Sequence, residues 1–261
     1  MNEPQEPQPP PVEMTESPGE APVSPEFLTP PLVEERYPFW GYRDVILLAA
    51  MAFVLLLFVG SVAQLLLRPG HASAFEAIAV QFVFEGLWFL MLYGVIRAGY
   101  GKPFWCSLGW LRPSHGFWRC AAWGVAVAAV TIALGSILPR PPGKSPMEQL
   151  LQDRASIVMV GFFAVTLGPL FEELAFRGFL MPLLARTFGP VAGVFLQAVP
   201  FAALHGFEYA WAWQQLILMF LAGTAFGWMR HKSGSTAAST YMHAGYNFVA
   251  AVGLLGQSFA P

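Results

Sequence analysis

The chain has 261 residues, of which 56% are hydrophobic and only 11% are charged, and its formal net charge is -2. A soluble domain of this size usually carries about 25% charged residues, so the composition excludes an ordinary soluble protein and indicates a polytopic membrane protein. No Lys/Arg cluster interleaves with aromatic residues, which argues against a nucleic-acid partner. The two cysteines, Cys106 and Cys120, provide no disulfide framework.

The first 38 residues differ in composition from the rest of the chain. They contain eleven prolines and eight of the sixteen acidic residues, and Arg36 is their single basic residue. Proline interrupts helices, and the segment has too few apolar residues to form a core. We therefore predict a disordered tail over residues 1–38, transmembrane helices and linkers over 39–154, and a second helical region over 155–256 that carries the polar motifs.

Seven apolar segments are candidates to cross a bilayer as helices, because its ~30 Å hydrocarbon core needs about 20 residues. They cover residues 44–67, 75–96, 119–138, 155–186, 190–205, 212–230 and 235–256. The fourth would reach about 48 Å if it were straight, so we predict a break at Gly168–Pro169. The predicted fold is an all-α, polytopic membrane helix bundle with about seven transmembrane helices.

The distribution of Lys and Arg predicts the orientation of the bundle. With the N-terminus inside, nine of these residues fall on the inner side and four on the outer side, while Arg177 stays within the membrane. Cytoplasmic loops carry an excess of basic residues. We therefore expect an integral protein of the cell (plasma) membrane with a cytoplasmic N-terminus.

The segment "FEELAFRGFL", residues 171–180, places three ionisable side chains within an apolar span. Glu173 and Arg177 are four residues apart, so they face each other on a helix and could form a structural ion pair. Glu172 lies ~100° away around the helix. The same arginine cannot easily serve both carboxylates, and we expect Glu172 to have another partner or a role in chemistry.

Two further segments bring polar groups to a similar depth. "FAALH" ends at His205, and "HAGYN" puts His243 and Asn247 four residues apart on one helical face. Counted from the inner ends of their spans, Glu172 and His205 lie at ~21 Å, and His243 and Asn247 at ~12 and ~18 Å. We expect these four side chains to surround one site inside the bundle.

Several kinds of chemistry fit these residue types. A carboxylate and an imidazole can take a proton from water, while a second imidazole and an amide can stabilise an oxyanion. One glutamate and two histidines could equally hold a divalent metal such as zinc, with the amide as a fourth ligand or an outer hydrogen-bond donor. Either arrangement suits hydrolysis of an amide bond.

The main alternative is a membrane protein without catalytic activity. The same residues would serve an immunity or scaffold protein, or a proton relay in a small proton-coupled transporter. A transporter usually shows internal repeats with paired broken helices, and we find one break and no repeat. The sequence also has no HExxH, GxGD or GxSxG motif, which argues against the other common protease classes.

The spacings EExxxR, FxxxH and HxxxN follow one another on successive segments. Together they resemble the motifs of the CAAX prenyl protease and bacteriocin-processing (CPBP, Abi-type) family of intramembrane proteases, over roughly residues 155–252. The resemblance implies an intramembrane endopeptidase, often described as a metalloprotease, that acts on a membrane-associated protein or peptide. Members of the family remove the last three residues of prenylated proteins, or are linked to bacteriocin maturation, self-immunity or protein secretion.

The resemblance also implies a role for each motif residue. Glu172 with His205 would activate the hydrolytic water. Glu173 with Arg177 would hold the site in shape. His243 with Asn247 would bind the oxyanion or a metal. A metal would be held by Glu172, His205 and His243.

Overall fold

The computed structural model describes residues 37–66 and 73–259. These residues form helices and no strand, which confirms the all-α class. The predicted disordered tail lies outside the described residues, apart from Tyr37 and Pro38.

Helices occur at all seven of the apolar segments. They are α1 (Tyr42–Leu66), α2 (Ala74–Gly94) with its π-helical extension η2 (Val95–Gly99), α4 (Phe117–Ile137), a broken stretch from α6 (Arg154–Val165) to α8 (Met181–Phe188), α9 (Pro190–Leu204), α10 (Trp213–Ser233) and α11 (Thr236–Gln257). Four stretches are long and apolar enough to cross a membrane, namely α1, α2 with η2, α4, and residues 154–188. Helix α9 is apolar but shorter, and the count of about seven spans stays a prediction.

The broken stretch changes its helix type where the first polar motif lies. Helix α6 ends at Val165, and Thr166, with φ -115 and ψ -81, separates it from α7 (Leu167–Glu173). The break thus falls at Thr166, slightly before the predicted Gly168–Pro169. Pro169 fits the first turn of α7 because its missing N–H would have no helical partner there. The π-helix η3 (Leu174–Leu180) follows, and such turns are frequent at functional sites.

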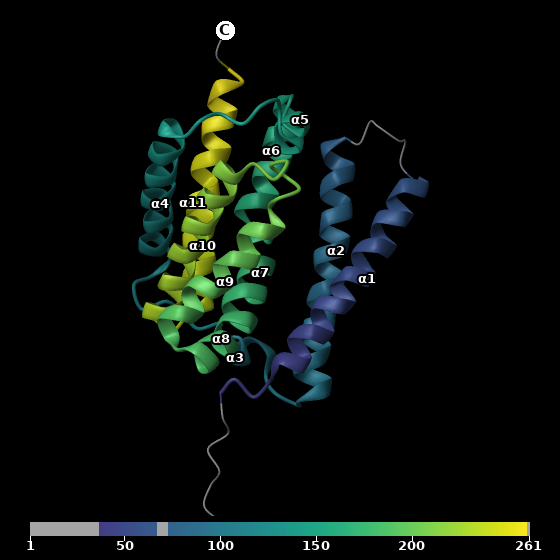
Figure 1. The fold of residues 1–261 in the computed structure, drawn as a ribbon, viewed down its shortest axis with the longest axis vertical. Helices are drawn as coiled ribbons and strands as arrows, with labels where there is room; N and C mark the ends of the chain where they lie inside the picture. Colours follow the sequence, from purple (N-terminus) through teal and green to yellow (C-terminus); the bar gives the residue numbers. More distant parts are fainter. Residues whose placement is uncertain (1–36, 67–72, 260–261) are drawn as a thin grey trace, which may run out of the picture. The chain divides into compact units, whose positions relative to one another are not determined.

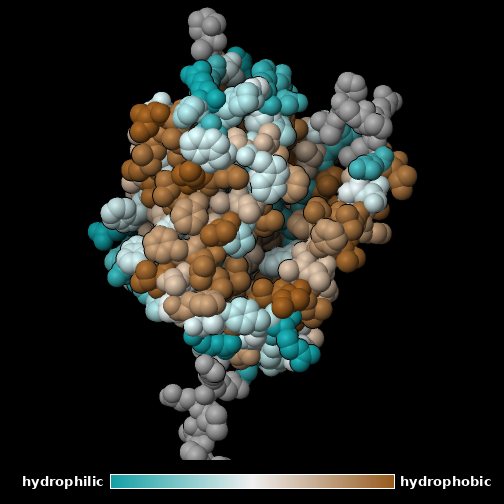
Figure 2. Space-filling view, in the orientation of Figure 1, coloured by the Kyte–Doolittle hydropathy of each residue, from teal (hydrophilic) through white to brown (hydrophobic). Residues whose placement is uncertain are grey.

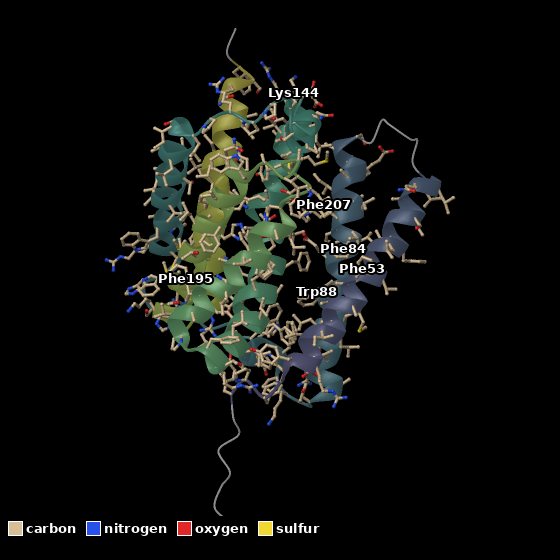
Figure 3. The ribbon with its side chains drawn as sticks, in the orientation of Figure 1. Phe53, Phe84, Trp88, Lys144, Phe195 and Phe207 are labelled. Carbon is tan, nitrogen blue, oxygen red and sulfur yellow. The ribbon has the colours of Figure 1, made fainter. Side chains whose placement is uncertain are left out.

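Two parts of the bundle lie side by side in Figure 1. Helices α1 and α2 form a hairpin, and α2 contacts α6 of the other group. Trp88 lies on the side of α2 that faces α7 (Figure 3) and packs against the buried cluster around Leu174. The second group contains α4 and the helices from α6 to α11, and it holds all the polar motifs.

Small residues allow the closest helix contact in this second group. A Cβ atom added to Gly124 of α4 would lie 1.8 Å from the backbone oxygen of Met242 in α11. One added to Gly245 of α11 would lie 2.2 Å from the backbone oxygen of Ala121. Membrane helices associate through such close backbone packing, because lipid tails are as apolar as the side chains that they contact. The contact fixes α11, which carries two motif residues, against α4.

The outer surface is mainly apolar between two polar ends. Figure 2 shows hydrophobic residues over the middle of the bundle and hydrophilic residues near its top and bottom. Phe53 of α1 and Phe195 of α9, for example, are 62% and 46% exposed. This pattern is the one expected where lipid tails surround the middle of a protein.

The segment before α1 is anchored below the motif helices. Trp40 is fully buried, stacks on Phe179 of η3 with ring centroids 5.1 Å apart, and donates from Nε1 to the Phe179 carbonyl at 3.0 Å. Arg186 of α8 donates to the carbonyl oxygens of Pro38 and Trp40. These contacts hold η3 and α8 against the start of the first helix.

Candidate active site

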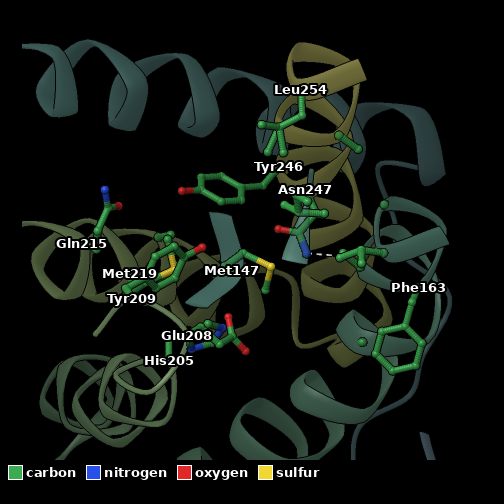
Figure 4. Close-up of a pocket in the computed structure, with 18 of the residues that line it drawn as sticks. Met147, Phe163, His205, Glu208, Tyr209, Gln215, Met219, Tyr246, Asn247 and Leu254 are labelled. Carbon is green, nitrogen blue, oxygen red and sulfur yellow. Dashed lines mark hydrogen bonds between the residues drawn. The ribbon is translucent and has the colours of Figure 1, made fainter. Parts of the chain in front are cut away.

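A cavity of about 450 Å³ lies among the helices of the second group (Figure 4) and is bordered on one side by Ala77, Ile78 and Gln81 of α2. Its wall includes Glu172 of α7, His205 at the end of α9, and His243 and Asn247 of α11. The structure therefore brings the four predicted site residues from three helical segments into one cavity. Further wall residues come from α4, α10 and the short helix α5 (Pro146–Leu150).

Glu173 and Arg177 form a buried ion pair beside this cavity. Both side chains are fully buried, and Arg177 Nη1 donates to Glu173 Oε1 at 2.8 Å. Arg177 Nη2 also donates to the backbone oxygen of Gly223 in α10 at 2.8 Å. Pairing and hydrogen bonding offset the cost of burying these charges, so the pair joins η3 and α10 to α7.

His243 is oriented by the same carboxylate. Its Nδ1 lies 3.0 Å from Glu173 Oε1, and because a carboxylate only accepts, Nδ1 carries the proton. The other nitrogen, Nε2, lies 3.9 Å from Glu172 Oε2, which is too far for a direct hydrogen bond. The ring stacks on Phe226, with centroids 4.4 Å apart. A carboxylate in this position fixes the tautomer and the orientation of the ring.

Glu172 differs from its neighbour in having no strong partner. Its side chain is 25% exposed, and its Oε2 is buried without a hydrogen-bond partner among the described residues. A buried carboxylate oxygen normally needs a partner. Since Glu172 lines the cavity, a water molecule or a substrate in the cavity is the partner that its position favours.

One of the two ring nitrogens of His205 is held by a hydrogen bond to the backbone, and the other is not. Its Nδ1 donates to the backbone oxygen of Phe201 at 2.8 Å, so Nε2 is unprotonated in the neutral ring and free to accept a proton. The Phe201 ring packs against both imidazoles, with centroid distances of 4.8 Å to His205 and 5.9 Å to His243. The guanidinium carbon of Arg177 lies 4.4 Å from the same centroid. Phe201 of the FxxxH motif therefore supports both histidines, a role that its spacing alone did not indicate.

Asn247 ties α11 to α6. Its Nδ2 donates to the backbone oxygen of Ala164 at 2.6 Å, as the dashed line in Figure 4 shows. This bond uses one of the two N–H groups of the amide and leaves the second for another acceptor.

Among the described residues, the three predicted metal ligands Glu172, His205 and His243 do not form a compact group of donors. Across residues 37–66 and 73–259, no three His, Cys, Asp or Glu side chains form a group that could hold an ion. The Nδ1 atoms of His205 and His243 are both engaged in hydrogen bonds, which leaves Nε2 of each ring as the nitrogen that could meet a ligand. We therefore derive no step through a metal.

Comparison with known proteins gives one match, over the part of the chain that carries the motifs. Residues 154–249 match the family model of type II CAAX prenyl endopeptidase Rce1-like proteins, a stretch that contains all three motifs. The predicted resemblance to the CPBP and CAAX protease family is thereby confirmed over this stretch, and the match supports a protease of CAAX type. The apolar helices described above support an integral membrane protein. Neither curated proteins nor solved structures gave a match.

Motif reasoning did not select one further carboxylate of the cavity wall. Glu208 follows His205 by three residues, in the loop between α9 and α10, and lines the same cavity. The sequence "HGFE" contains it. The other site residues were predicted from their position along a membrane span, and a residue in a loop has no such position.

Proposed function

We propose that this protein is an intramembrane endopeptidase that uses Glu172 to activate water for hydrolysis of a peptide bond in a membrane-associated protein or peptide. The observation that carries the proposal is the difference between two adjacent glutamates. Glu173 is neutralised by Arg177 at 2.8 Å and bonded to His243 through the same oxygen, whereas Glu172 lines the cavity and its ion-pair contact, to His243 Nε2, is 3.9 Å long. A carboxylate free to take a proton from water is what a general base requires.

The first step is attack by water. Glu172, helped by the accepting Nε2 of His205, takes a proton from a water molecule, and the hydroxide oxygen bonds to the carbonyl carbon of the substrate. The carbonyl oxygen becomes an oxyanion. His243 and Asn247 stabilise it, His243 by donating from Nε2 when both ring nitrogens carry a proton, and Asn247 by its second N–H.

The family match and the composition support a class of substrate and a location. A CAAX-type endopeptidase domain supports a substrate that is itself associated with the membrane. The excess of Lys and Arg on one side of the spans supports a cytoplasmic N-terminus in the plasma membrane.

The test is cleavage of a membrane-associated reporter peptide by the purified protein in liposomes. Glu172→Gln should reduce cleavage by about 10²-fold or more with little change in thermal stability, because the nearest charged group, His243 Nε2, is 3.9 Å away and too far for a hydrogen bond. Glu148→Gln is the matched control, since Glu148 caps α5 and glutamine can replace glutamate in a capping box. Full activity in Glu172→Gln would end the proposal.

Two further measurements separate the alternatives. We expect cleavage to persist after treatment with a chelator, and a loss that zinc restores would favour a metal-dependent mechanism. If the cellular function survives alanine at Glu172, His205 and His243 together, an immunity or scaffold role replaces catalysis.

A further inference from the structure

Basic side chains gather at one end of the helix bundle. This end, called the basic end below, contains the starts of α1 and α4, the ends of η2, α8 and α10, and the short helix α3 (Phe104–Ser107) (Figure 1). The N–H of Thr236 donates to the Gly109 carbonyl at 2.8 Å, and the Trp40 indole donates to the Phe179 carbonyl, so these connections lie together. The end holds one described acidic residue, Asp44, and eight described basic ones, which are Arg43, Arg97, Lys102, Arg112, Arg119, Arg186, Arg230 and Lys232.

The opposite end, called the α5 end below, carries fewer bases and more acids. It contains α5, the loop between α9 and α10 and the end of α11 (Figure 1), and the N–H of Met147 in α5 donates to the Glu208 carbonyl of that loop at 3.1 Å. Its described basic residues are Arg140, Lys144 and Arg154, and its described acidic ones are Glu76, Glu148, Asp153 and Glu208. Because the cytoplasmic ends of membrane helices carry the excess of Lys and Arg, the charges predict that the basic end faces the cytoplasm and the α5 end faces the outside.

The cavity extends from the polar motifs to the α5 end. Met147 and Leu150 of α5 line it, as do Gln215 in the first turn of α10 and Leu254 near the end of α11. Along α11 the wall runs from His243 to Leu254, which is ~16 Å of helix. None of its described lining residues belongs to α1, η2, α3 or α8, which are elements of the basic end. The space beside the motifs therefore continues toward the α5 end.

Buried side chains separate the cavity from the basic end. Arg177, which pairs with Glu173, is fully buried, and so is Gln197 in the middle of α9. Nearer to the basic end, Leu183 of α8 also has no exposed surface. Water and a polypeptide thus have a path to Glu172 from the α5 end, and the described residues leave none from the basic end.

We infer that the cavity opens on the external side of the membrane, and that the substrate is a membrane-anchored or exported polypeptide whose cleaved segment has already crossed the bilayer. The choice of substrate rests on the proposed hydrolysis, whereas the direction of the opening rests on the charges and the cavity wall alone. A segment presented from outside enters between α5 and the loop that follows α9, and reaches Glu172 from there. A peptide bond that stays in the cytoplasm, such as one in a lipidated C-terminus on the inner face, does not reach Glu172.

Cysteine modification tests the direction of the opening without any assay of activity. A negatively charged methanethiosulfonate, which does not cross membranes, is added to right-side-out and to inside-out vesicles that contain the full chain. Cys106 of α3 is exposed at the basic end and Cys120 is buried, so wild type should react only in inside-out vesicles. Lys144→Cys at the α5 end (Figure 3) and Gln215→Cys in the cavity wall (Figure 4), each combined with Cys106→Ser, should react only in right-side-out vesicles.

Each pattern of modification decides the inference. Reaction of Gln215→Cys from the cytoplasmic side, from both sides or from neither overturns it, because the cavity would then open elsewhere or remain closed. Reaction of Lys144→Cys from the cytoplasmic side overturns the orientation on which it depends.

Two reporters test the substrate class in cells. Both are single-span proteins with the same segment next to the membrane, which lies outside in one and in the cytoplasm in the other. We expect cleavage of the outside reporter, loss of that cleavage with Glu172→Gln, and no cleavage of the cytoplasmic reporter. Cleavage of the cytoplasmic reporter overturns the inference. If wild type cleaves neither reporter, the proposed function fails, while the cysteine modification still decides on which side the cavity opens.

Discussion

Glu173 Oε1 lies 3.0 Å from His243 Nδ1 and thereby joins the first polar motif to the last one. The same oxygen accepts from Arg177 Nη1 at 2.8 Å. One atom therefore connects α7, η3 and α11, and it sets both the charge balance of the buried group and the tautomer of the imidazole. Glu173 thus has a structural role and an orienting role, which can be separated by mutation.

Removing Glu173 alone should damage both stability and activity. Glu173→Leu leaves Arg177 as an uncompensated buried charge, which costs about 3–5 kcal/mol. The double variant Glu173→Leu/Arg177→Met replaces the pair by apolar groups and should regain most of that stability, because Gln197 still donates to the Gly223 carbonyl. Its cleavage should stay about 10²-fold or more below wild type, since His243 has lost the partner that orients it.

Thermal unfolding in detergent and reporter cleavage measure the two effects. A double variant that recovers cleavage together with stability would show that Glu173 only neutralises Arg177.

Gly223 of α10 should tolerate no side chain, in contrast to Gly253 of α11. A Cβ at Gly223 would lie 2.7 Å from the ring of Phe201 and 3.3 Å from Arg177 Nη2. Gly223→Ala should therefore destabilise the fold by about 1–3 kcal/mol and lower kcat, because Phe201 supports both histidines. Nothing lies within 4 Å of a Cβ at Gly253, so Gly253→Ala should stabilise by about 0.5–1 kcal/mol.

The unfolding midpoints and kcat values of the two alanine variants decide this prediction. Equal effects on stability would mean that the contact of α10 with Phe201 is looser than the distances indicate.

The sequence predicted the existence of the long helices well, because each is an apolar run of roughly the length that a bilayer requires. It placed the break of the fourth span at Gly168–Pro169, whereas the helix changes at Thr166. Pro169 cannot donate to the carbonyl of Val165 four residues earlier, and its ring clashes with that carbonyl, so α6 ends at Val165. The π-helix η3 was not predicted, since its Arg177 is held by a carbonyl of α10 that lies 46 residues away in sequence.

The residues that lie together in the cavity could also be predicted from the sequence, but the contacts among them could not. Depth along each span indicates which residues lie at one level, as for Glu172 and His205. It does not indicate which face of a helix points inward, or that Glu173 binds both Arg177 and His243. Glu208 escaped notice because its position depends on a folded loop, and loops carry no regular period from which a side chain can be placed.

Trp40 should stabilise η3 through its indole N–H as well as its ring. Trp40→Phe keeps an aromatic ring against Phe179 but leaves the Phe179 carbonyl without its side-chain donor. We expect a loss of about 1–2 kcal/mol in stability, and Trp40→Ala should cost about 3–5 kcal/mol. Unfolding followed by tryptophan fluorescence or circular dichroism measures both variants, and equal losses would mean that the ring contributes nothing beyond the hydrogen bond.

Asp153 should make the stability of α6 depend on pH. It is the N-cap of this helix, and hydrogen bonds from the side chain and the backbone N–H of Ser156 lower the pKa of its carboxyl below the 3.8 of an exposed aspartate. A lowered folded-state pKa contributes stability that is present above pH 3.8 and is lost as the pH falls through the folded-state value. The positive end of the helix dipole favours the same ionised form.

Asp153→Asn isolates this contribution, because asparagine is also a good N-cap but does not titrate. We expect wild type to unfold at a higher temperature than Asp153→Asn at neutral pH, and the two midpoints to converge well below pH 3.8. Other carboxyl groups titrate equally in both proteins, so their effects cancel in the difference. A constant difference at all pH values would mean that the asparagine changes the packing at the start of α6 and that the charge of Asp153 contributes no stability.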